Sequence, residues 1–256
     1  MQLTGFDKRI AFVTGAAGGI GQQLVRQLLA SGSTVVASDV KAPVIEDAPA
    51  AGRLLAHALD VSDGDAVTQL VRRIEAEVGP IELGVNVAGV LSGTLAADTS
   101  DAEWRRVFAV NCDGVFHVGR ALAQAMQPRG HGAIVTVGSN AAGVPRHAMS
   151  AYAASKAAAT MFTRCLGLEL APHGVRCNIV APGSTLTPMQ TGMWADEHGA
   201  ERVIAGLPGL YKAGIPLRKL ATPADIANAV MFLLSDQAGH IAMSDLYVDG
   251  GATLRA

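Results

Sequence analysis

Runs of apolar residues that end on glycine or a polar residue alternate with stretches of helical spacing along the whole chain. A parallel sheet needs this order, because its strands are buried on both faces and each connection carries a helix. Seven segments are predicted to be strands: 9–15, 34–39, 54–60, 83–89, 132–139, 175–183 and 246–251. Helices are predicted at about 20–29, 62–78, 101–127, 151–171 and 223–235. The alternation predicts an α/β fold built on a doubly wound parallel sheet.

The 256 residues are expected to form one domain, 1–256, because no linker or repeat divides the sequence. Half of the residues are hydrophobic and only 4% are aromatic, while 29 are glycine, which favours close packing on small side chains. One segment, 184–214, is less regular and mixes apolar residues with prolines and glycines. Long irregular inserts are usually functional, so we expect 184–214 to act as a lid over a binding site.

Several function classes are disfavoured by composition. A net charge of −2 without a cluster of Lys and Arg argues against nucleic acid and anionic membrane as partners. The three cysteines, Cys112, Cys165 and Cys177, have no CxxC spacing, and the histidines show no HExxH motif, so no metal site is expected. The N-terminus resembles no signal peptide, and the longest charge-free run, 177–195, contains prolines and hydroxyls unsuited to a membrane helix. A cytoplasmic protein is expected.

The sequence "TGAAGGIG" (14–21) joins the first predicted strand to the first helix. Glycines at this position let the backbone approach a pyrophosphate, and the helix N-terminus faces the anion. The glycines alone would also fit a tight turn without a ligand. Asp39, at the end of the second strand, favours a dinucleotide because an acid there accepts hydrogen bonds from the adenosine ribose. The same sheet edge is predicted to carry the other cofactor contacts: Gly15, Gly18, Gly19, Ile20, Gly21, Asp60, Val61, Asn86, Ala88 and Gly89.

The cofactor is predicted to be NAD and not NADP. The carboxylate of Asp39 would meet the 2′-phosphate of NADP with like charge, which costs several kcal/mol. Gly18 and Gly19 supply no cation that would offset this repulsion.

A candidate catalytic group lies around the fifth predicted strand and the helix after it. Tyr152 stands four residues before Lys156, so both side chains share one helix face, and Ser139 lies thirteen residues upstream at the strand end. A tyrosine titrates near 10, and a neighbouring ammonium would lower that pKa toward the range of a useful base. Such a group could deprotonate an alcohol while Ser139 holds its oxygen. Tyr152 and Lys156 alone would also fit an ordinary exposed helical pair.

These motifs together resemble the short-chain dehydrogenase/reductase family over essentially the whole chain. The resemblance rests on "TGAAGGIG", "NVAG" (86–89), Asn111, Ser139, the Tyr152–Lys156 pair and "PG" (182–183). It implies a seven-stranded Rossmann-type sheet, NAD(P) chemistry and a homotetramer formed through the helices that carry Asn111 and Tyr152. Val87 replaces the second asparagine of the usual "NNAG" motif, with no expected effect on catalysis.

The resemblance also implies roles for individual residues. Tyr152 is the acid/base, and Lys156 holds the nicotinamide ribose and tunes the phenol. Ser139 orients the substrate oxygen, and Asn111 holds a water in a proton relay. Pro182, Gly183 and Thr187 lie at the nicotinamide, where Thr187 contacts the carboxamide.

A narrower resemblance is carried by "PRHAMSAYAASKAA", by "LGLELAPHGVRCNIVAPGSTLTPMQ" with Trp194, and by "GIPLRKLATPADIANAVMFLLSD". It is to family members that oxidise a cyclohexadiene diol acid with NAD in siderophore biosynthesis, and it implies a small cyclic carboxylate substrate. Arg146 is predicted to bind that carboxylate, because a guanidinium matches it with two parallel hydrogen bonds. The predicted substrate contacts are Ser139, Arg146, Met149, Tyr152, Met189, Gln190 and Trp194.

Three other functions remain open at this point. The same chemistry could act on an amino analogue, dihydro-3-hydroxyanthranilate, or the protein could be a carbonyl reductase for ketones without a carboxylate. A non-catalytic nucleotide-sensing protein would keep the fold, although Asn111, Ser139, Tyr152 and Lys156 argue against it.

Overall fold

The computed structural model describes residues 2–254, and its centre is a seven-stranded sheet with every neighbouring pair parallel. The strand order is β3-β2-β1-β4-β5-β6-β9, so the doubly wound sheet predicted from the sequence is confirmed. The strands are β1 (Ile10–Thr14), β2 (Thr34–Asp39), β3 (Arg53–Ala58), β4 (Ile81–Asn86), β5 (Gly132–Val137), β6 (Val175–Pro182) and β9 (Asp245–Val248).

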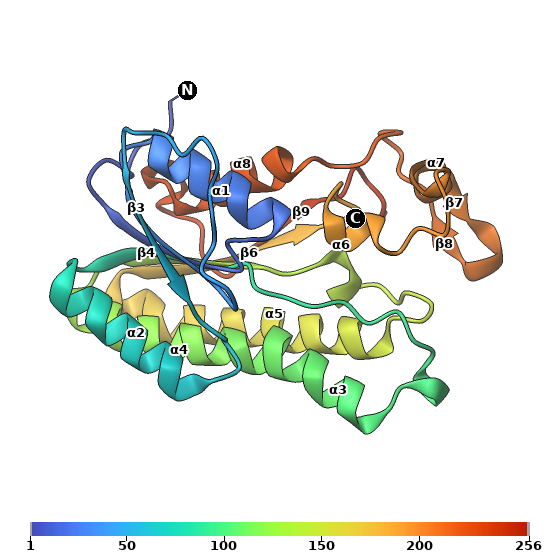
Figure 1. The fold of residues 1–256 in the computed structure, drawn as a ribbon, viewed down its shortest axis with the longest axis horizontal. Coiled ribbons are helices and arrows are strands. Elements are labelled where there is room, and N and C mark those ends of the chain that lie inside the picture. Colours follow the sequence, from blue (N-terminus) through green and yellow to red (C-terminus); the bar gives the residue numbers. More distant parts are fainter. Residues whose placement is uncertain (1, 255–256) are drawn as a thin grey trace.

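Helices cover both faces of the sheet (Figure 1). One face carries α1 (Gly19–Ala30) and α8 (Pro223–Leu234), and the other carries α2 (Gly64–Glu77), α4 (Gly114–Met126) and α5 (Ser150–Leu170). Each face has its own hydrophobic cluster, because alternate residues of a strand such as Phe12 and Val13 point to opposite sides. Short 3₁₀ turns join the main elements: η1 (Ala96–Asp98), η3 (Gln127–Arg129), η4 (Asn140–Ala142), η5 (Ala171–His173) and η7 (Asp236–Ala238).

The helices begin in different ways. Asp63 caps α2 by accepting from the amides of Asp65 and Ala66, and Thr222 forms a capping box with Asp225 at the start of α8. Helix α1 follows Gly18, whose N-cap position has no side chain to cap the helix. Its first amides therefore keep their hydrogen-bonding capacity for another acceptor.

The predicted helix 101–127 is interrupted. It consists of α3 (Asp101–Phe108), a π-helical turn η2 (Ala109–Asp113) and α4. The wider turn contains Asn111, whose side chain exchanges hydrogen bonds with the backbone of Val90 and donates to Ser155. The wider turn is confined to the residues around Asn111, and the apolar spacing of the helices on either side is unchanged.

Segment 184–214 is more regular than its sequence indicates. It contains α6 (Pro188–Thr191), α7 (Gly199–Ala205), the 3₁₀ turn η6 (Pro208–Leu210) and an antiparallel hairpin of β7 (Gly206–Leu207) and β8 (Lys212–Ala213). These short elements lie together at one end of the sheet (Figure 1).

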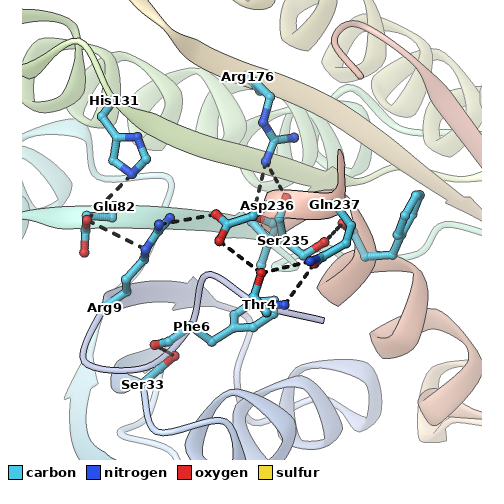
Figure 2. A network of polar contacts seen from close by, with 12 residues as sticks. Thr4, Phe6, Arg9, Ser33, Glu82, His131, Arg176, Ser235, Asp236 and Gln237 are labelled. Carbon is cyan, nitrogen blue, oxygen red and sulfur yellow. Dashed lines mark hydrogen bonds and ion pairs between the residues drawn. The ribbon is translucent and has the colours of Figure 1, made fainter. Parts of the chain in front are cut away.

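The amino ends of the strands are closed by a polar network (Figure 2). Arg9, before β1, contacts Asp236 at 3.3 Å and Glu82 at 4.0 Å. Arg176, at the start of β6, donates three hydrogen bonds to the carbonyls that end α8, at Leu233, Leu234 and Ser235. Arg176 thus lies at the edge opposite Tyr152 and serves the fold. Within residues 2–254 no helix is long and apolar enough to cross a membrane.

Candidate functional site

The chain reverses its direction across the sheet between β1 and β4, where two glycine-containing loops meet. Gly15 has φ +66°, and a Cβ there would lie 2.4 Å from the amide nitrogen of Ala88. A Cβ on Gly21 would lie 2.2 Å from the carbonyl oxygen of Gly15. Glycine is therefore required at position 15 for the two loops to approach each other, and at position 21 for α1 to pack on the loop that precedes it. Ligands of open α/β sheets bind at this kind of switch point.

The start of α1 fits the phosphates of a dinucleotide. Gly18 gives no side-chain cap, so the amides of Gly19, Ile20 and Gly21 face the site together with the positive end of the helix. At the end of β2, Asp39 accepts from the amides of Ala17 (3.0 Å) and Val40 (2.8 Å), which fixes its carboxylate beside the glycine loop.

The remaining predicted cofactor residues follow the same edge. Asp60 accepts from both the amide and the hydroxyl of Ser62, and Val61 is buried with its carbonyl bound to His117. Buried Asn86 donates to Thr136, and its side-chain oxygen has no hydrogen-bond partner among residues 2–254. The Asp60 side chain and the Val61 carbonyl thus fix their loop, whereas the side-chain oxygen of Asn86 keeps its capacity to accept a hydrogen bond.

Lys156 is buried, with 5% of its surface exposed, and its ammonium donates to the carbonyl of Val137 at 3.0 Å. Burial lowers its pKa to about 8. A Cβ on Gly89 would lie 3.2 Å from this ammonium and 3.3 Å from Oδ1 of Asn111. The bare backbone of Gly89 therefore packs directly against both polar groups, and Asn111 is fully buried and does not line the cleft that Lys156 lines.

Tyr152 and Ser139 face the same cleft and are hydrogen-bonded to each other. The hydrogen bond lowers the pKa of Tyr152, but burial has the larger effect and raises it above the ordinary value. The expected lowering of the Tyr152 pKa is therefore wrong for the protein alone, because burial has the largest effect on it. Ser139 Oγ also accepts from the amide of Ala141, which fixes its position at the end of β5.

The cleft has about 1060 Å³ of empty space, counting its open mouth. It joins the proposed catalytic, nicotinamide and substrate positions, which come from five separate parts of the chain. The predicted residues that line it are Ile20, Gly89, Ser139, Arg146, Met149, Tyr152, Lys156, Pro182, Gly183, Thr187, Met189 and Gln190. Gly19 adjoins this group, because a Cβ there would lie 3.1 Å from Cγ2 of Thr187.

Trp194 does not line the cleft, whereas its neighbour Met193 does. The indole packs so closely on Gly199 that a Cβ at position 199 would lie 2.1 Å from Cγ of Trp194. We therefore assign Trp194 a packing role within segment 184–214.

Sequence reasoning missed Lys212, whose side chain lines the cleft from the β7–β8 hairpin. No motif marks this lysine, and only the fold of the hairpin brings it to the site. Arg146 lines the cleft as well; burial lowers its pKa, and the charge of Asp249 opposes that shift.

Comparison with known proteins agrees with this geometry. The family described as short chain dehydrogenase matches residues 9–198. The 2,3-dihydro-2,3-dihydroxybenzoate dehydrogenase of Bacillus subtilis (strain 168) is 54% identical, over 99% of this chain and 99% of that protein. The enzyme of the same name from Escherichia coli (strain K12) is 41% identical, over 98% of this chain and 99% of that protein.

The crystal structure of levodione reductase superposes with a TM-score of 0.89 at 26% identity, covering 98% of this chain and 100% of that chain. The fold, the glycine loop at the switch point and the family match lead to one assignment. The chain belongs to the short-chain dehydrogenase family and is an oxidoreductase that uses a nicotinamide nucleotide.

Proposed function

We propose that this enzyme oxidises 2,3-dihydro-2,3-dihydroxybenzoate to 2,3-dihydroxybenzoate with NAD, a step of siderophore biosynthesis. The observation that carries the proposal is the cleft itself, which the guanidinium of Arg146 lines together with Tyr152 and Ser139. Within residues 2–254, Arg146 has no ion-pair partner within 4 Å, so an anionic substrate can take that place. The names of two relatives, 54% and 41% identical, support the same substrate.

The residues divide the chemistry between them. Tyr152 takes the proton of the C3 hydroxyl, and Ser139 holds that oxygen by a hydrogen bond. When bound, the nicotinamide supplies the acceptor for the hydride that leaves C3. The ring is then a ketone, and transfer of its C2 proton to the new carbonyl oxygen gives the aromatic 2,3-dihydroxybenzoate.

Lys156 and Asn111 support the base. The Lys156 ammonium lies one helical turn from Tyr152, where its positive charge stabilises the phenolate as it forms. Both side-chain hydrogens of Asn111 are donated to Val90 and Ser155, and its Oδ1 accepts from the amide of Val90. A relay water would therefore have to donate to the second lone pair of this Oδ1.

We propose NAD as the specific cofactor, because Asp39 places a carboxylate where the adenosine ribose is expected. We also propose a homotetramer. The helices α4 and α5 carry exposed apolar side chains, Phe116, Met161 and Leu168, which an assembly would cover. A cytoplasmic location is proposed from the supply of NAD there and from three cysteines that are all free.

The test is direct. Purified protein is mixed with NAD and the diol acid, and NADH absorbance and the catechol product are followed. Efficient turnover supports the proposal. A clear preference for the amino analogue, or reduction of neutral ketones only, would replace it with one of those activities, and cofactor binding without any turnover would indicate a nucleotide sensor.

A further inference from the structure

Lys212 lines the substrate cleft from the β7–β8 hairpin, which carries none of the proposed catalytic residues. It lies on β8, paired with Leu207 of β7, and it lines the same cleft as Arg146, Ser139 and Tyr152. The site is therefore bounded on one side by the β5–α5 loop and on another by the hairpin.

The hairpin that carries Lys212 has a defined geometry. Gly206 has φ +89°, and a Cβ on Gly214 would lie 2.4 Å from the carbonyl oxygen of Ile204, so both ends of the hairpin depend on glycine. Ile215, directly after it, is buried with Val203 and Ala252. This packing fixes the base of the hairpin next to the cleft.

Lys212 and Arg146 are two cations that line one cleft, and among residues 2–254 neither has an ion-pair partner within 4 Å. Burial lowers the pKa of Lys212, and the positive charge of Arg146 lowers it further. Within residues 2–254, Lys212 makes no ion pair and no side-chain hydrogen bond. Asp249 is the acid whose charge acts on Arg146, but its oxygens accept from Asn140, Gly251 and Thr253.

An anion between these two groups would relieve both their repulsion and the cost of burying them without a partner. Arginine offers a planar fork, whereas lysine is a compact point charge, so a single carboxylate can accept from both. The hydroxyl to be oxidised must lie at Ser139 and Tyr152, which line the same cleft. A small ring can therefore present its carboxylate to the cations and its alcohol to the base.

We propose that Lys212 is a second substrate-binding residue, which together with Arg146 selects cyclic substrates that carry a carboxylate. The inference rests on the proposed function and extends it to the hairpin. Because Lys212 belongs to segment 184–214, binding of the carboxylate also draws this segment onto the substrate.

The test compares Lys212→Gln with the wild type on the diol acid and on the corresponding cyclohexadiene diol that lacks the carboxyl group. Loss of a hydrogen bond to a charged group should lower kcat/KM for the acid by about 10- to 100-fold, mainly through KM. The neutral diol should be oxidised equally by both proteins. Lys212→Arg should recover most of the loss, and Lys219→Gln, at an exposed lysine outside the cleft, is the matched control.

A second readout is binding without turnover. With NADH present, Lys212→Gln should weaken the affinity for 2,3-dihydroxybenzoate by a similar factor and leave that for catechol unchanged. Equal losses on acid and neutral ligands, or none on either, would overturn the role of Lys212. If instead the wild type shows no preference for the acid, it is the proposed function that fails.

Discussion

The two ends of the central sheet use charged residues in opposite ways. At the amino end, Arg9 is paired with Asp236, and Arg176 donates three hydrogen bonds to the last carbonyls of α8 (Figure 2). At the carboxyl end, Arg146 and Lys212 face a cleft without an ion-pair partner among residues 2–254. Charged side chains that are paired connect elements of the fold. A partly buried charge without an ion-pair partner lowers the stability of the protein, and such charges are typical of ligand-binding sites. Substitutions at the two ends should therefore separate activity from stability.

The largest effect is expected at Tyr152. Tyr152→Phe removes the proton acceptor and keeps the ring, so kcat should fall by about 10²- to 10⁴-fold, the usual contribution of general acid–base catalysis. Cofactor affinity, measured by fluorescence titration, should change little. Tyr211→Phe is the control, because Tyr211 is 99% exposed. A Tyr152→Phe enzyme with more than a tenth of wild-type kcat would remove Tyr152 from the mechanism.

The next effect concerns the cofactor. Like charge between Asp39 and a 2′-phosphate costs several kcal/mol, so the wild type should prefer NAD to NADP by about 100-fold or more in kcat/KM. Asp39→Asn keeps an acceptor for the amide of Ala17 and removes the negative charge. This variant should therefore show a smaller preference for NAD over NADP. Equal use of both cofactors by the wild type would contradict this assignment.

Arg146→Ala should lower kcat/KM by roughly 10- to 150-fold on the diol acid, the loss expected for hydrogen bonds to a charged group. The neutral diol should show almost no loss. His147→Ala, the adjacent exposed residue on the same loop, should behave like wild type on both. A similar loss on both substrates would show that Arg146 supports the loop and does not bind the carboxylate.

Substitution of Arg176, at the amino end, should lower stability without lowering activity. Arg176→Met leaves three carbonyls at the end of α8 without their donor and should lower the free energy of unfolding by about 1–3 kcal/mol. The change is measured by urea denaturation, and kcat/KM at 25 °C should stay within twofold of wild type. A variant that lost activity and kept its stability would contradict the division between the two ends.

Much of this arrangement could be predicted from the sequence, because buried strands and amphipathic helices leave a periodic signal. The glycine loop, Asp39 and Ser139 could be predicted in this way, since each lies at or near a strand end, and Tyr152 and Lys156 were predicted from their spacing of one helical turn. The π turn at Asn111 was missed because one extra residue per turn does not change the apolar pattern of the flanking helices.

The β7–β8 hairpin was missed for a different reason. Strands of two residues are too short to show alternation, so nothing local distinguishes Lys212 from a surface lysine. The pKa of Tyr152 was assigned the wrong direction because spacing reveals a neighbouring charge, whereas burial depends on the whole fold. Sequence reasoning thus identified the proposed catalytic groups better than the environment that tunes them.

The smallest and most local effect is expected in segment 184–214. Its beginning is held in place, because Thr185 bridges to Ala221 and Thr187 lies against Gly19. Its far part, α7 with the hairpin, meets the rest of the chain mainly through the small cluster of Val203, Ile215 and Ala252. Segments with few buried contacts open most easily, so bound substrate should increase their protection from hydrogen exchange the most.

We therefore predict that NAD with 2,3-dihydroxybenzoate slows amide hydrogen exchange in 199–213 more than in 184–188. Helix α8, which is packed on the core, is the internal reference and should not change. Catechol in place of the acid should give less protection, because it offers no carboxylate to Arg146 and Lys212. Unchanged exchange in 199–213 would mean that this segment is a fixed wall of the cleft or a contact between subunits, and not a lid.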